Sequence, residues 1–166
     1  MATTKEQEKT KFEFLPDEKK QIGDIVKRYP DPKAATLPAL WVAQKRFGWV
    51  NGDVCNAVAE QLNVAPSHVL GVATFYTMFN NEPVGKYLIQ VCATLSCSLM
   101  GAEHVFDYIC NKLGIKGGET TKDGKFTVMK VECLASCGTA PMMQINDDYY
   151  ENLTEEKIDQ ILGSLE

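Results

Sequence analysis

The chain has 166 residues, of which 45% are hydrophobic and 23% charged, and this composition excludes a disordered, collagen-like or low-complexity polypeptide. The length fits one compact domain, or one domain with a short helical extension. Its 17 Lys and Arg against 22 Asp and Glu leave a formal net charge of −5. Because this charge provides no net attraction to phosphate backbones or anionic lipid, we expect neither nucleic acid nor a membrane surface as a partner.

Apolar residues at helical spacing predict that residues 1–80 form a bundle of short helices. Residues 1–12 are polar, and we expect them to be disordered. The helices are predicted over residues 16–29, 36–47, 53–62 and 65–79. Asp53 is the predicted N-cap of the third helix.

The uncharged stretch 61–81 requires a separate test, because its length is close to that of a membrane span. Asn63 and Pro66 interrupt it, so we interpret it as two buried helices and their turn. The opening segment lacks the run of about 7 to 15 apolar residues that a secretory signal needs. We therefore expect a reducing compartment, where closely spaced cysteines more often serve metal, cluster or redox sites than structural disulfides.

The spacing changes after residue 80, and residues 81–166 are predicted to form an α+β (α/β) domain. In chain order, the predicted elements are a strand at 86–92, a helix at 102–113, a strand at 125–131, a strand pair at 142–146 and 149–150, and a helix at 154–165. This order predicts a small mixed sheet packed against helices.

Four of the six cysteines form two close pairs, each following a predicted strand. Cys92 and Cys97 make a C-x4-C pair, and Cys133 and Cys137 make a C-x3-C pair. Two loops at the ends of strands can bring four thiols to one point. Both surrounding stretches, 87–102 and 133–146, contain no charged residue. The absence of carboxylates favours an iron-sulfur cluster, whose reduction adds negative charge.

Other interpretations of the cysteine pairs stay open on spacing alone. Structural zinc prefers short C-x2-4-C spacings, and a dithiol oxidoreductase more often has C-x-x-C, which is absent. Disulfides require an oxidising compartment. Cys55 and Cys110 lie beside apolar helix faces, so we expect them to be core residues. The chain has neither a G-x-G-x-x-G motif after a strand nor a P-loop, so we expect no site for NAD or ATP.

Short motifs throughout the chain, in addition to the cysteines, resemble one known family. In the helical half these are Tyr29-Pro30, Lys33-Ala34-Ala35, Leu37-Pro38-Ala39-Leu40, Ala43-Gln44, Gly48-Trp49-Val50 and the run from Val69 to Phe79. In the second half they are Cys92, Cys97, Gly101, Asp123-Gly124-Lys125-Phe126, Cys133-Leu134, Cys137, Ala140-Pro141 and Asn146-Asp147. Over about residues 12–163 the chain resembles the small iron-sulfur subunit of respiratory complex I, which is the E-type or 24 kDa subunit of NADH-quinone oxidoreductase.

This resemblance implies a helical bundle (1–80) followed by a thioredoxin-like 2Fe-2S ferredoxin domain (81–166). It implies that one 2Fe-2S cluster is held by four ligands, Cys92, Cys97, Cys133 and Cys137. In this family the cluster accepts one electron from FMN, which a larger F-type flavoprotein subunit holds and NADH reduces. The FMN and NADH sites are then expected only in that partner, and the helical half is expected to bind it.

The resemblance further implies contacts with other peripheral-arm subunits and no direct membrane insertion. Through the complex, the chain would lie on the cytoplasmic face of a bacterial inner membrane. The equivalent 2Fe-2S subunit of a soluble NAD-linked hydrogenase or formate dehydrogenase resembles the chain equally well, and a zinc-stapled binding module is a third alternative.

One residue departs from the family pattern, because members often have Gly where Ala135 stands. A positive φ at this position would cost an alanine about 1 kcal/mol.

Overall fold

The computed structural model describes residues 12–165, which form two compact units. The first unit ends at Pro83 and the second begins at Val84. Each unit has its own hydrophobic core, and no residue is shared between the two cores. The units are therefore described separately.

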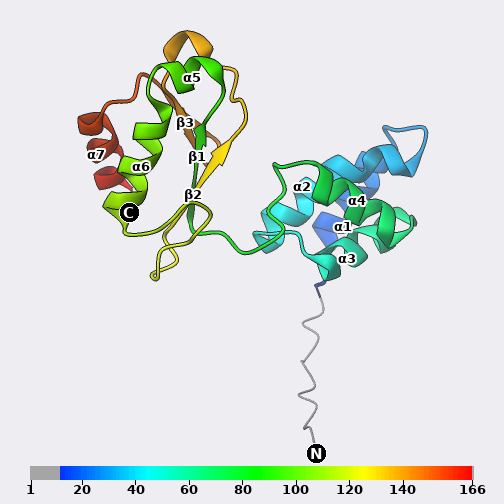
Figure 1. Ribbon diagram of the computed structural model, residues 1–166. Helices are drawn as coiled ribbons and strands as arrows, with labels where there is room; N and C mark the ends of the chain where they lie inside the picture. Colours follow the sequence, from blue (N-terminus) through cyan, green and yellow to red (C-terminus); the bar gives the residue numbers. More distant parts are fainter. Residues whose placement is uncertain (1–11, 166) are drawn as a thin grey trace, which may run out of the picture. The chain divides into compact units, whose positions relative to one another are not determined.

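The first unit is helical, as predicted. Its elements are α1 (Pro16–Val26), a 3-10 helix η1 (Pro32–Ala35), α2 (Thr36–Phe47), α3 (Gly52–Leu62) and α4 (Pro66–Phe75) (Figure 1). The core between these helices includes Leu40, Val54, Val58 and Val69, whose side chains are fully buried. Pro30 and Pro32 follow α1, and Gly48 ends α2 with a φ of 83°.

The ends of three helices differ from the prediction. Helix α1 ends at Val26, three residues before the predicted end. The N-cap of α3 is Asn51, whose side chain accepts a hydrogen bond from the Val54 N–H at 2.9 Å, so the prediction of Asp53 is wrong. Helix α4 ends four residues before Phe79. The segment after it is held by Gln44 instead, which donates to the Met78 carbonyl at 3.0 Å and accepts from the Asn80 N–H at 2.7 Å.

The prediction of disorder for residues 1–12 is wrong at its last residue. The Phe12 ring packs edge-on against Phe47, with ring centroids 5.2 Å apart. Residues 1–11 lie outside the described part of the chain.

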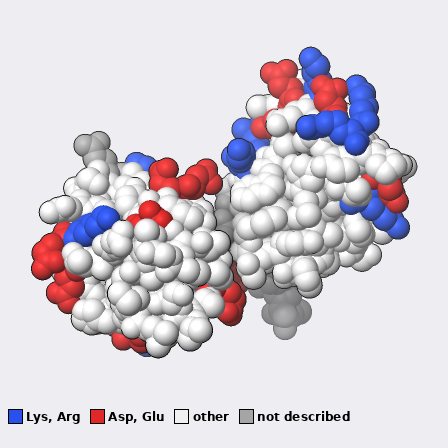
Figure 2. Space-filling model, turned by 90° about the horizontal axis from the view of Figure 1, so that it is seen from above, with Lys and Arg blue, Asp and Glu red and all other residues white. Residues whose placement is uncertain are grey.

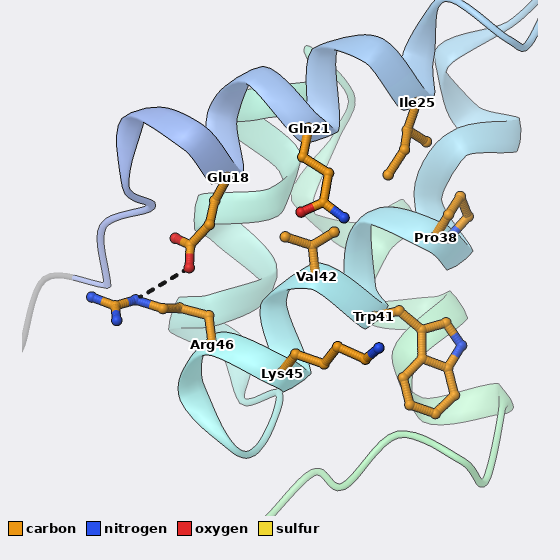
Figure 3. Close-up of a pocket in the computed structure, with 8 residues that line it drawn as sticks. All are labelled: Glu18, Gln21, Ile25, Pro38, Trp41, Val42, Lys45 and Arg46. Carbon is orange, nitrogen blue, oxygen red and sulfur yellow. Dashed lines mark ion pairs between the residues drawn. The ribbon is translucent and has the colours of Figure 1, made fainter. Parts of the chain in front are cut away.

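A groove of about 470 Å³ opens between α1 and α2 (Figure 3). It is lined by Glu18, Gln21, Ile25, Pro38, Trp41, Val42, Lys45 and Arg46. The Arg46 Nε atom lies 3.6 Å from a carboxylate oxygen of Glu18, at the rim. None of the residues that line the groove is a cysteine.

The second unit contains the predicted mixed sheet. Its strands are β1 (Tyr87–Cys92), β2 (Phe126–Val131), β3 (Met143–Ile145) and β4 (Asp148–Tyr150), in the spatial order β2-β1-β3-β4. Strand β1 is parallel to β2, whereas β3 is antiparallel to both β1 and β4. The α+β fold class is thus confirmed.

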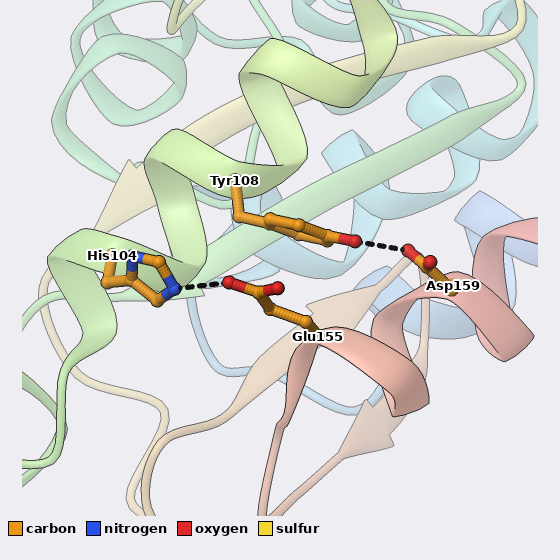
Figure 4. A network of polar contacts seen from close by, with 4 residues as sticks. All are labelled: His104, Tyr108, Glu155 and Asp159. Atoms are coloured by element: carbon orange, nitrogen blue, oxygen red, sulfur yellow. Dashed lines mark hydrogen bonds and ion pairs between the residues drawn. The ribbon is translucent and has the colours of Figure 1, made fainter.

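Two helices, α6 (Ala102–Leu113) and α7 (Glu155–Ser164), lie on the same side of this sheet (Figure 1). Polar contacts join them at their exposed edges (Figure 4). His104 Nε2 lies 2.7 Å from Glu155 Oε1, and the Tyr108 hydroxyl group donates to Asp159 at 2.8 Å. The Asp159 hydrogen bond is the main reason that the pKa of Tyr108 rises to about 12.

Cys55 and Cys110 belong to the two cores, as expected. Cys55 lies in α3 and Cys110 in α6, and both side chains are buried. Burial raises the pKa of the Cys55 thiol to about 11 and raises that of Cys110 as well. Neither thiol therefore has the acidity of a reactive cysteine.

The helices that fill the uncharged stretch 61–81 are short. Within the described residues, the structure contains no helix with the length and apolar character required to cross a membrane.

Candidate metal centre

Both cysteine pairs lie at one end of the sheet. Strands β1 and β2 are parallel, and Cys92 pairs in register with Val131, so both strands end on the same side of the sheet, at their C-terminal ends. The first cysteine loop (residues 92–101) begins at the last residue of β1, and the second cysteine loop (residues 132–140) follows β2. The Ala93 N–H donates to the Val131 carbonyl at 2.9 Å, which ties the start of the first cysteine loop to the end of β2.

Each loop contains a short helix that periodicity did not predict. Cys97 lies in α5 (Leu95–Leu99), and Cys137 begins a 3-10 helix, η2 (Cys137–Thr139). Figure 1 shows α5 and η2 together at one end of the sheet. Helices of five and three residues are too short to show a helical repeat in the sequence. This is why they could not be found from the pattern.

The thiols of the first cysteine loop are buried. Cys92 is 4% exposed and Cys97 is 2% exposed. Burial acts to raise the pKa of Cys92, but hydrogen bonds from the Thr94 and Leu134 amides and from Cys97 outweigh it, and the net pKa is lowered. The pKa of Cys97 is raised, first by burial and then by its hydrogen bond to Cys92. Of these two thiols, Cys92 is therefore the one that loses its proton first.

The thiols of the second cysteine loop, Cys133 and Cys137, are exposed. The Ala135 N–H donates to Cys133 Sγ at 3.3 Å. Ala135 has a φ of 63°, so this position does require the left-handed conformation that favours glycine. The strain is about 1 kcal/mol, and it accompanies the turn that aims the Ala135 N–H at sulfur.

The structure brings part of the predicted ligand set together. The Cys97 thiol is close enough to the thiols of Cys92 and Cys137 for both to raise its pKa. In residues 12–165, however, no three or more His, Cys, Asp or Glu side chains form a group arranged to hold a metal ion. The four thiols therefore lie on two adjoining loops without forming a complete coordination shell.

These residues fit a 2Fe-2S cluster in their chemistry. Four thiols are the usual ligand set of such a cluster, and hydrogen bonds to sulfur are one of the means by which proteins set its potential. The Ala135 N–H donates to Cys133 Sγ at 3.3 Å, and the backbone amides of Thr94 and Leu134 lower the pKa of Cys92. The donors are therefore present on both loops.

Side chains from β4 and the residues after it hold the second cysteine loop. The Tyr149 hydroxyl group donates to the Leu134 carbonyl at 2.9 Å, and the Glu151 carboxylate accepts hydrogen bonds from Ser136 and Thr139. Sequence reasoning missed both contacts. Tyr149 and Glu151 lie 15 residues beyond their partners Leu134 and Ser136, and no spacing rule links them.

The surface around the cysteine loops is largely uncharged. Figure 2 views the second unit from the end that carries α5 and η2, and its carboxylates lie mostly toward the edges of that face. Three apolar side chains of the first cysteine loop are exposed, namely Leu95 (70%), Leu99 (78%) and Met100 (61%). Exposed apolar side chains grouped in this way are typical of a protein interface.

Comparison with known proteins identifies the family. The family model described as "Thioredoxin-like [2Fe-2S] ferredoxin" matches residues 22–166. The chain belongs to the thioredoxin-like [2Fe-2S] ferredoxin family. This family is defined by one 2Fe-2S cluster in a thioredoxin-like fold, and the strand order of the second unit agrees with such a fold.

Relatives within this ferredoxin family are subunits of an oxidoreductase. The chain is 44% identical over 146 residues to the E-type subunit, number 2, of NADH-quinone oxidoreductase from Rhizobium meliloti, covering 88% of this chain and 87% of that protein. It is 42% identical over 155 residues to NADH-quinone oxidoreductase subunit 2 of Thermus thermophilus, covering 92% and 86% of the two chains. The family resemblance predicted from the motifs is thus confirmed.

A solved structure of similar fold is an NAD+-reducing [NiFe]-hydrogenase in its air-oxidized state. The TM-score is 0.66 at 19% sequence identity, and the match covers 76% of this ferredoxin-family chain and 22% of the hydrogenase chain. The chain thus spans about a fifth of that protein. At this identity the likeness supports the fold only.

Proposed function

We propose that this chain is the electron-carrying E-type subunit of an NADH-quinone oxidoreductase and that Cys92, Cys97, Cys133 and Cys137 hold its 2Fe-2S cluster. The observation that carries the ligand assignment is the position of both cysteine pairs on adjoining loops at one end of the β1-β2 pair. Cys55 and Cys110 are buried in the two cores and lie on neither loop. In this proposal, residues 1–80 are the helical domain and residues 81–166 the ferredoxin domain.

When bound, the cluster supplies one-electron storage. The chain contributes the thiols, the amide N–H groups that tune the sulfurs, and burial of Cys92 and Cys97. The electron comes from FMN that NADH reduces in the partner flavoprotein, so this chain alone has no reaction with NADH. Through the assembled complex it lies on the cytoplasmic face of a bacterial inner membrane, with other peripheral-arm subunits beside it.

Exposed apolar residues support a protein partner on each unit. In the helical unit, the end of α4 and the residues after it expose Phe75 (76%), Tyr76 (39%) and Met78 (39%). These large side chains are the surface that we propose for binding the flavoprotein. The apolar residues of α5 would shield the cluster from water where the electron enters.

The function is tested by electron delivery. The iron- and sulfide-loaded chain is mixed with the partner flavoprotein and NADH under anaerobic conditions, and the reduced cluster is followed by electron paramagnetic resonance. We expect a rhombic reduced signal when both NADH and the flavoprotein are present, and no signal when the flavoprotein is omitted. A signal with NADH alone would contradict the proposal, because it would require an NADH site on this chain.

The zinc-stapled alternative makes the opposite prediction about the isolated protein. A zinc protein is colourless and gives no paramagnetic signal after dithionite reduction, whereas the 2Fe-2S protein is brown and gives one. Purification of a zinc-loaded, colourless chain that does not take up iron and sulfide would overturn the proposal. The flavoprotein with which the chain co-purifies separates the quinone oxidoreductase from a hydrogenase or formate dehydrogenase.

A further inference from the structure

Glu151, just after β4, points into the second cysteine loop and accepts two hydrogen bonds there. Its Oε1 atom accepts from Thr139 Oγ1 at 2.6 Å and also from Ser136 Oγ, and the two hydroxyl oxygens lie 2.8 Å apart. Lys157 Nζ donates to the backbone carbonyl of Glu151 at 2.5 Å. The residue is thus fixed at its backbone and at its carboxylate.

Neighbouring residues extend this contact along the loop. The Tyr149 hydroxyl group donates to the Leu134 carbonyl at 2.9 Å, and the Asn152 N–H donates to the Thr139 carbonyl at 2.8 Å. Residues 149–152 therefore hold the second cysteine loop through side chains and backbone, on both sides of Cys137. Of these residues, only Glu151 brings a formal charge.

The position of this charge matters because the second cysteine loop itself carries one formal charge, on Glu132 directly before Cys133, and none between Cys133 and Cys137. Residues 133–146 contain no charged side chain, yet the fold brings the Glu151 carboxylate to Ser136, the residue before Cys137. The hydrogen bonds from Ser136 and Thr139 lower the pKa of Glu151, so the carboxylate is ionised at neutral pH. A 2Fe-2S cluster gains one unit of negative charge on reduction, and a fixed negative charge nearby opposes that gain.

We propose that Glu151 lowers the reduction potential of the cluster, by holding Ser136 and Thr139 in place and by adding one negative charge beside Cys137. This inference rests on the proposed ligand set. Glu151 acts through the loop and through space, not as a ligand, so it is a positioning residue. Its effect is on the one-electron step: the cluster takes up one electron, no covalent bond forms or breaks, and the carboxylate remains ionised.

The test is a mediated redox titration of the full-length, cluster-loaded chain, followed by electron paramagnetic resonance. In Glu151→Gln the amide oxygen still accepts from both hydroxyl groups, but the charge is gone. We expect the ratio of reduced to oxidised cluster at a fixed potential to rise about three- to tenfold, a tenfold rise being about 59 mV upward for a one-electron couple. A merely structural role would change the cluster content and leave the potential where it was.

Asp123→Asn is the matched control. Asp123 also accepts a hydroxyl hydrogen bond, from Thr121 at 2.5 Å, and a backbone hydrogen bond from Lys125 at 3.0 Å. It lies before β2, so the six residues of that strand, about 20 Å at about 3.3 Å per residue, separate it from the second cysteine loop. We expect the reduction potential of the cluster in Asp123→Asn to equal that in the unsubstituted chain.

Equal potentials in the unsubstituted chain and in both variants would overturn the inference. It would also be overturned if Glu151→Gln failed to take up the cluster while Asp123→Asn loaded normally, because the retained acceptor should preserve the loop. Absence of a 2Fe-2S signal in the unsubstituted chain would instead overturn the proposed function, and the inference with it.

Discussion

The two cysteine loops reach the same end of the sheet but are held in different ways. In the first cysteine loop, Cys92 and Cys97 are buried among apolar residues, and Cys97 lies within a helix. In the second, Cys133 and Cys137 are exposed, and contacts from Tyr149 and Glu151 hold the segment between them. One pair of thiols is thus part of the hydrophobic core, and the other depends on polar contacts at the surface.

This difference separates two tasks within one candidate site. A buried loop gives two sulfurs a fixed position and a low-dielectric environment. An exposed loop with a left-handed residue at Ala135 can adjust its sulfurs and receive charge from a distant carboxylate. We therefore expect substitutions in the first loop to change stability and substitutions around the second to change local order and potential.

The largest expected difference between the loops concerns the metal-free chain. Cys97→Ser places a hydroxyl group in a buried position and should lower the free energy of unfolding by about 1–3 kcal/mol. Cys137→Ser changes an exposed side chain and should cost less than about 0.5 kcal/mol. Urea unfolding under reducing conditions measures both. Equal losses in the two variants would show that the loops are equally buried.

The contact from Tyr149 tests the support of the second cysteine loop. Tyr149→Phe removes the hydroxyl group that donates to the Leu134 carbonyl. We expect this change to lower the free energy of unfolding by about 0.5–1.5 kcal/mol. Hydrogen exchange should show faster opening of residues 133–139 and no change in residues 92–101. Tyr150→Phe is the control, since its hydroxyl group is not part of this contact. Faster hydrogen exchange in both cysteine loops would contradict the claim that Tyr149 supports only the second one.

Relief of the backbone strain at Ala135 should raise the free energy of unfolding, by less than the losses above. Ala135→Gly relieves about 1 kcal/mol of left-handed strain but adds backbone freedom to the unfolded chain, so we expect a net stabilisation of about 0.5 kcal/mol. Ala140, at the end of η2, has a φ of −65°, and Ala140→Gly should be destabilising by about 0.5–1 kcal/mol. The opposite signs are measured by urea unfolding, and a loss of stability in Ala135→Gly would rule out the strain.

The smallest effect is a pH dependence confined to the second cysteine loop. The pKa of Glu151 is below the ordinary value of 4.5, so its contacts stabilise the folded state above that pH and are lost as the pH falls through the lowered pKa. Below pH 4.5, exchange in residues 133–139 should accelerate more in the unsubstituted metal-free chain than in Glu151→Gln. Residues 92–101 should serve as the internal reference, and equal acceleration in both proteins would exclude Glu151 as the cause.

Much of this arrangement could be predicted from the sequence because it depends on periodicity and local motifs. The helical stripes around Leu40 and Val58 and the apolar strands around Ile89 and Val128 indicate the two kinds of unit without any tertiary information. The cysteine pairs were found because each follows a strand. The need for a left-handed residue at Ala135 came from the family resemblance.

What could not be predicted depends on residues brought together only by folding. Helix α5 has five residues, fewer than the repeat needed to reveal it. Asn51 competes with Asp53 as a cap, and its extended backbone decides in its favour. Glu151 lies outside the uncharged stretch that predicted a site without carboxylates, yet β4 returns it to Ser136. A charge pattern in sequence therefore describes the loop but not its environment.

The most direct test of the ligand assignment is the iron and sulfide content of six variants, each with one cysteine changed to alanine. Changes at Cys92, Cys97, Cys133 or Cys137 should each abolish the 2Fe-2S content and the reduced paramagnetic signal. Cys55→Ala and Cys110→Ala should retain both. A full cluster in any of the first four variants, or its loss in both core variants while the first four retain it, would contradict the assignment of the two cysteine loops as one metal centre.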